Sequence, residues 1–174
     1  MTHSPSPIVR FAMENGALLA AYFILKFAVT VFSLDYTWFT AINALMMIGI
    51  PIIIYRLVKR FRDEQFQSFS FSQGFAAAFM LLFFASLPEA LCQYLYIEFI
   101  NPQYIETQLQ QVSQALETFN EAKNSQTINE LLTAFDQAQT PSSIQMAFQT
   151  IFNNLYLGSL IAIVIGFITK RNPQ

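Results

Sequence analysis

The segment GFAAAFMLLFFASLPEALCQYLYIEFI, Gly74–Ile100, decides the fold class of this protein. Its stretch from Phe75 to Ile97 holds one carboxylate, Glu89, and no cationic side chain, and it is long enough to cross a bilayer as a helix. A charge at membrane depth costs on the order of 2.5 kcal/mol unless a partner or water meets it. The segment therefore predicts a membrane span that carries a polar site.

The composition of the chain indicates a multi-pass membrane protein. Of its 174 residues, 54% are hydrophobic and only 11% are charged, whereas a soluble domain has about 25% charged residues. The net charge of −2 and the scattered cations argue against a nucleic-acid partner and leave the lipid bilayer as the expected surroundings. Cys92 is the single cysteine, so it can form neither an intramolecular disulfide nor a multi-thiolate metal site.

Three more apolar segments predict three more spans. We expect the four spans at about 13–34, 38–57, 75–99 and 150–169. In the last one, Gly158, Ala162 and Gly166 recur at intervals of four residues, which predicts close contact with a neighbouring helix. The predicted fold class is all-α, a four-span transmembrane helix bundle that forms a single membrane domain over residues 1–174.

The distribution of cations predicts how the protein is oriented. Arg10, Lys170 and Arg171 lie on one side of the membrane, together with the basic loop after the second span, which contains Arg56, Lys59, Arg60 and Arg62. The long third loop on the other side has only Lys123. The positive-inside bias therefore places both termini in the cytoplasm. The basic loop holds this orientation or, as an alternative, recruits anionic lipid.

Residues 101–149 predict an exoplasmic helical insertion between the third and fourth spans. One apolar stripe on an otherwise polar helix is formed by Ile105, Leu109, Val112, Leu116 and Phe119. We expect a second amphipathic helix from Ile128 to Phe135, and a third that begins with Thr140 as cap and Pro141 at its first position. Because isolated short helices are marginal in water, the stripe should pack on the second helix or on an extension of the fourth span.

Depth along the spans predicts a polar cluster in the outer half of the bundle. At about 1.5 Å of rise per residue, five polar side chains from the four spans reach similar levels: Lys26, Asn43, Glu89, Gln93 and Tyr156. The simplest interpretation is a Lys26–Glu89 ion pair that fixes the helix register. One alternative is a functional site, either proton- or ion-responsive or a polar ligand pocket. The other alternative is that these side chains do not meet.

The sequence lacks the motifs of known enzymes. It contains no nucleophile elbow, zinc-protease motif, Walker loop or dinucleotide glycine fingerprint, and His3 is its only histidine. We therefore expect no catalytic residues, metal or cofactor. The favoured function is structural or associative, with an envelope protein or a second copy as partner. The alternative is a small ion- or proton-responsive, transporter-like protein that uses the Lys26/Glu89 site.

Short motifs in this order resemble those of one family. Ser68-Phe69, then Ser72-Gln73-Gly74-Phe75, and Asn101-Pro102-Gln103-Tyr104 before a Gln/Glu-rich helix are similar to the family catalogued as domain of unknown function 4199. Its members are small integral membrane proteins found mainly in Bacteroidetes. The resemblance covers nearly the whole chain and implies the four-span topology and a bacterial source. It implies no activity, because the family has no assigned chemistry.

Overall fold

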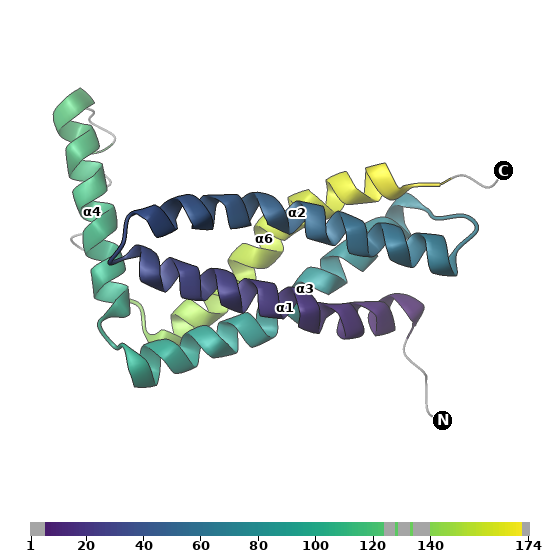
Figure 1. Ribbon diagram of the computed structural model, residues 1–174, viewed down its shortest axis with the longest axis horizontal. Coiled ribbons are helices and arrows are strands. Elements are labelled where there is room, and N and C mark those ends of the chain that lie inside the picture. The colour runs from purple at the N-terminus through teal and green to yellow at the C-terminus, as the bar shows by residue number, and fades with distance from the viewer. Residues whose placement is uncertain (1–5, 124–127, 129–132, 134–139, 172–174) are drawn as a thin grey trace.

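The computed structural model describes residues 6–123, 128, 133 and 140–171. Four long helices form a bundle (Figure 1): α1 Pro7–Ser33, α2 Trp38–Gln65, α3 Phe71–Leu95, which continues into the π-helix η1 Tyr96–Ile100, and α6 Ser143–Thr169. Each is long and apolar enough to cross a membrane. The fifth α-helix of the described part is α4, Tyr104–Lys123. No strand occurs among the described residues, so the predicted all-α fold with four spans is confirmed.

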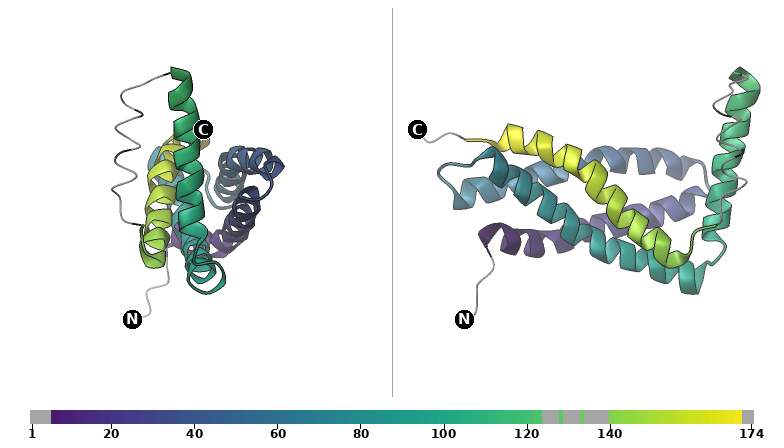
Figure 2. Two further views of the ribbon diagram at one scale, coloured as in Figure 1. Left: turned by 90° about the vertical axis from the view of Figure 1, so that its left-hand side faces the viewer. Right: turned by 180° about the vertical axis from the view of Figure 1, so that it is seen from behind.

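Helix α3 lies at the centre of the bundle. It packs along both α1 and α6, whereas α2 packs mainly on α1. Small residues make these contacts close, and Ala77, Ala78 and Ala85 of α3 are fully buried. Both termini lie at one end of the bundle, and α4 crosses the opposite end roughly at a right angle (Figures 1 and 2).

The predicted small-residue face of α6 is confirmed. Gly158, Ala162 and Gly166 are buried, and the last of them meets the first turn of α3. A Cβ atom on Gly166 would lie 3.0 Å from the backbone oxygen of Phe71, and one on Gly74 would lie 3.0 Å from the Cα atom of Gly166. The two backbones therefore approach each other so closely that neither glycine has room for a side chain.

Two predicted element boundaries were wrong. Helix α2 continues to Gln65, so the four cations of the predicted basic loop, Arg56, Lys59, Arg60 and Arg62, lie on its last turns instead. An ion pair between Arg60 and Glu64, one turn apart, stabilises this extension, and cations are favourable near a helix C-terminus. Helix α6 begins after Ser142 rather than at Pro141, because Ser142 and Gln145 form a reciprocal capping box.

Polar contacts tie the ends of α2 and α6 together at the terminal end of the bundle. Arg62 pairs with Asp63 at 2.8 Å and donates a hydrogen bond to the carbonyl oxygen of Thr169 at 3.2 Å. Phe69 and Arg171 exchange two backbone hydrogen bonds of 3.0 and 2.8 Å. The start of α3 is thereby fixed against the end of α6.

An apolar cluster closes the end of the bundle that lies opposite the termini. Its buried members are Phe27, Ile97, Tyr104 and Ile105, and Leu109 packs against them together with Met146 of α6. The extension of the fourth span thus covers the beginning of the predicted stripe, as expected. Further along α4, Val112 is 45% exposed. The second predicted helix, Ile128 to Phe135, falls mainly outside the described residues.

Candidate functional site

A partly open cavity of about 580 Å³ lies between α1, α2, α3 and α6. Its main polar lining consists of Lys26, Glu89, Gln93, Thr150, Asn153 and Asn154. Apolar side chains such as Phe23, Ile50 and Leu82 complete the walls, and the start of α4 adds Tyr104. Polar groups at membrane depth are costly unless they meet one another, water or a ligand. The cavity is therefore the candidate site.

Glu89 is the most deeply buried charged group of the cavity. It is 5% exposed, and its Oε2 atom accepts a hydrogen bond of 2.5 Å from the side-chain amide of Asn154. Lys26 lines the same cavity and is close enough to attract the carboxylate, but no direct ion pair joins the two. Glu89 thus has an amide as its direct partner, and the predicted Lys26–Glu89 ion pair is not formed.

A second polar contact joins α3 to α6 one turn away. The hydroxyl of Thr150 donates a hydrogen bond to Oε1 of Gln93. Glu89 and Gln93 of α3 therefore each have a hydrogen-bond partner on α6. By contrast, the side chains of Lys26 and Asn153 form no hydrogen bond or ion pair with any part of the chain that the structure describes, so both are available to whatever occupies the cavity.

Two of the five predicted cluster residues lie outside the cavity. Asn43 donates a hydrogen bond to the hydroxyl of Thr30 at 3.0 Å, and its buried Oδ1 atom has no hydrogen-bond partner among the residues that the structure describes. Tyr156 is 72% exposed, because it follows Asn154 by two residues and so lies about 200° around the helix from it. The structure therefore brings together Lys26, Glu89 and Gln93 and leaves Asn43 and Tyr156 apart.

The residues of α6 that sequence reasoning missed follow a visible pattern. Thr150 and Asn154 precede Gly158 at intervals of four residues, so they lie on the same helix face as the small residues that pack on α3. Polar residues that continue the packed face of a helix also point into the bundle. The four-residue spacing predicts Asn154 as the polar residue that faces the bundle, whereas depth along the span alone led to Tyr156.

Tyr104 closes the end of the cavity next to α4. Its ring is 1% exposed and makes edge-to-face contacts with Phe27 and Tyr96, at centroid distances of 5.9 and 5.6 Å. Its hydroxyl accepts a hydrogen bond of 2.9 Å from Gln108. Burial, together with the neighbouring Tyr96, raises the pKa of Tyr104 to about 12. The phenol is therefore neutral at physiological pH.

The family model described as "Protein of unknown function (DUF4199)" matches residues 14–171. The chain belongs to this family. The match includes α2, α3, α4, α6 and most of α1, and therefore every wall of the cavity. No curated protein and no solved structure matches the chain. For this DUF4199 member, the functional argument consequently rests on the geometry of the cavity.

Proposed function

We propose that this DUF4199 protein is a non-enzymatic membrane protein that binds a small polar solute in the cavity between α1, α2, α3 and α6. The observation that carries the proposal is that Lys26 and Glu89 line one intramembrane cavity without a direct ion pair. Intramembrane ionisable groups that do not neutralise each other directly mark ligand sites and transport paths. The proposal is related to the alternative that the sequence offered, a small ion- or proton-responsive, transporter-like protein that uses the Lys26/Glu89 site.

The cavity has the size and lining of a small-molecule site. Its volume of about 580 Å³ falls within the range of about 300–1,000 Å³ that is typical of ligand pockets. The lining offers an ammonium group, a carboxylate and amides on mostly apolar walls. A small zwitterion, such as a free amino acid, would meet both charges at once. A cation or proton at Glu89 is the simpler occupant of the same site.

Thermal unfolding of the purified protein in mild detergent tests this function. Ligand present at about 100 times its Kd should add about 2.7 kcal/mol to the free energy of unfolding. We expect such a shift with members of a panel of zwitterionic amino acids, and its loss in Lys26→Met and Glu89→Gln. Glu117→Gln is the control, because Glu117 is exposed on α4 and does not line this cavity. A wild-type protein whose thermal unfolding changes with no amino acid, salt or pH would contradict the proposal. Measurement of flux into proteoliposomes would then distinguish transport from binding.

The proposal includes a cytoplasmic location of both termini in a bacterial inner membrane. Its support is the topology, which places Arg10, the end of α2 and Arg171 at the end of the bundle that holds the termini (Figure 1), as the positive-inside bias favours. Labelling of Arg60→Cys by an impermeant thiol reagent from outside the cell would contradict this orientation.

A second candidate function is association with an envelope protein or a second copy through α4. The observation in its favour is that α4 projects beyond the bundle (Figure 2), with Val112 of its apolar stripe 45% exposed. Surfaces of this kind mark interaction sites when they are contiguous. A protein that is monomeric in detergent and captures no partner by crosslinking in cells would remove this candidate.

A further inference from the structure

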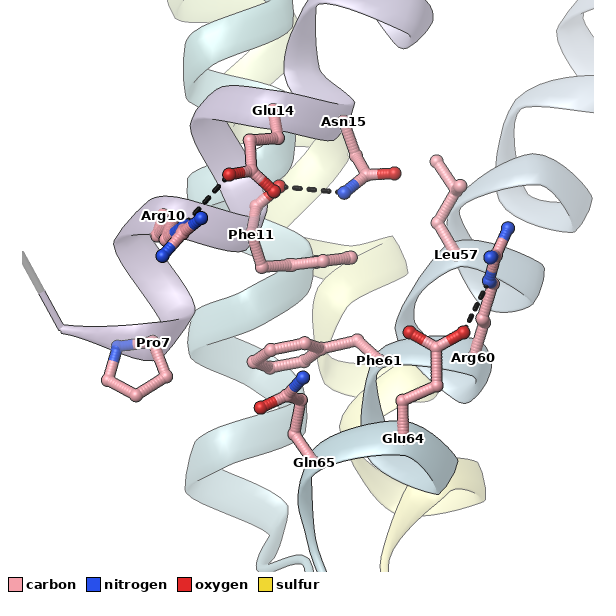
Figure 3. A pocket seen from close by; sticks show the side chains of 10 residues that line it. All are labelled: Pro7, Arg10, Phe11, Glu14, Asn15, Leu57, Arg60, Phe61, Glu64 and Gln65. Atoms are coloured by element: carbon pink, nitrogen blue, oxygen red, sulfur yellow. Dashed lines mark hydrogen bonds and ion pairs between the residues drawn. The ribbon is translucent and has the colours of Figure 1, made fainter.

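A second polar cavity, of about 640 Å³, lies at the end of the bundle that holds the termini, between the start of α1 and the end of α2. Arg10 and Glu14 line its α1 side, and Arg60 and Glu64 line its α2 side (Figure 3). The rings of Phe11 and Phe61 stack between the two sides, with their centroids 4.2 Å apart. The cavity thus has two charged walls on an aromatic base, and it shares none of these residues with the site inside the bundle.

The two walls carry the same charge pattern. Within each wall the Nε atom of the arginine pairs with Oε1 of the glutamate one turn later, at 2.8 Å on α1 and 2.7 Å on α2. These bonds occupy one guanidinium nitrogen each. The terminal nitrogens of both arginines and the Oε2 atoms of both glutamates have no partner in the described part of the chain, and all four side chains are at least 54% exposed. The cavity therefore offers the free terminal nitrogens of two guanidinium groups and the free oxygens of two carboxylates, and its formal charges balance.

The predicted bounds of the spans would put these groups in the headgroup layer of a membrane. Arg10 lies three residues before the predicted first span and Arg60 lies three residues after the predicted second span. At about 1.5 Å per residue, each is about 4.5 Å outside the hydrocarbon core. The polar layer on each side of that core is about 5–7 Å thick. A ligand in this cavity would therefore sit at the depth of phospholipid headgroups.

We propose that this cavity binds the headgroup of a zwitterionic phospholipid with a primary amine, of the phosphatidylethanolamine class. The terminal nitrogens of Arg10 and Arg60 would bind the phosphate, for which guanidinium groups are well suited. The free oxygens of Glu14 and Glu64 would accept hydrogen bonds from the ammonium group. An anionic headgroup without an amine would leave the two carboxylates next to a like charge, which is why the balanced charge selects a zwitterion.

Native mass spectrometry of the purified full-length protein tests this site. The protein is incubated with equal amounts of phosphatidylethanolamine, phosphatidylglycerol and phosphatidylcholine, and lipid adducts are counted. We expect phosphatidylethanolamine to bind in preference to both others. The double variant Arg10→Gln with Arg60→Gln should weaken that binding at least about tenfold. The variant Glu14→Gln with Glu64→Gln should lose the preference over phosphatidylglycerol.

The matched control is Lys59→Gln with Lys170→Gln, which removes two cations outside the cavity lining. The proposal is overturned if this control weakens binding as much as the arginine variant does, since attraction to the basic end as a whole would then suffice. Equal binding of phosphatidylglycerol by wild type would overturn it as well, and so would displacement of the lipid by an equal concentration of inorganic phosphate. The selectivity of the wild type decides the matter even if one variant fails to fold.

Discussion

Gly74→Ala should lower the free energy of unfolding by about 2 kcal/mol, because the added methyl group has no room between α3 and α6. Its Cβ atom would lie 2.6 Å from the hydroxyl oxygen of Thr169 and 3.0 Å from the Cα atom of Gly166. The hydroxyl cannot easily move, since Thr169 is fully buried and donates to the carbonyl oxygen of Ile165 at 2.7 Å. The α3 and α6 backbones must therefore separate, and denaturant titration in detergent measures the cost.

Gly158→Ala is the matched control for this variant. Its Cβ atom would meet Leu82 at 2.7 Å, but only through the end of a flexible side chain that can change rotamer. Both substitutions gain the same helix propensity of about 1 kcal/mol, so this gain cancels in the comparison. If the two variants were equally stable, the close backbone approach of α3 to α6 would not be present in the protein.

Asn154→Leu should destabilise the protein by about 2–3 kcal/mol, because it removes the hydrogen bond to the buried carboxylate of Glu89. Adding Glu89→Leu to this variant should restore most of the loss, because both polar partners are then replaced by apolar groups of similar size. Thermal unfolding of the wild type, both single variants and the double variant gives the coupling energy between the two side chains.

A second double-mutant cycle, which combines Lys26→Met with Glu89→Leu, provides the comparison. Lys26 shares the cavity with Glu89 but does not pair with it directly, so their attraction acts over a longer distance and is weaker than a direct contact. The coupling energy between Lys26 and Glu89 should therefore be smaller than that between Asn154 and Glu89. The opposite order would show that the two charges form the ion pair that depth along the spans suggested.

Hydropathy predicted the four spans because a helix that crosses a bilayer must be apolar over its length. The same reasoning placed Lys26, Glu89 and Gln93 near one level, and all three line the cavity. Depth along a helix does not fix rotation about its axis, which is why Tyr156 was chosen instead of Asn154. The end of α2 was predicted as a loop because its charges end the apolar run, whereas charged residues can continue a helix beyond the membrane.

The central claim, that a polar solute binds in the cavity between the four spans, requires water to enter that cavity, and cysteine labelling on α6 tests this most directly. In a Cys92→Ala background, Leu157→Cys would lie on the cavity wall. Phe152→Cys would lie nearer the start of the helix but about 200° from Asn154, and both native side chains are more than half exposed, at 52% and 68%. A small water-soluble methanethiosulfonate reacts only with a thiolate, which requires water. We predict rapid labelling at 157 and little at 152, whereas a 157 position as unreactive as 152 would contradict the account.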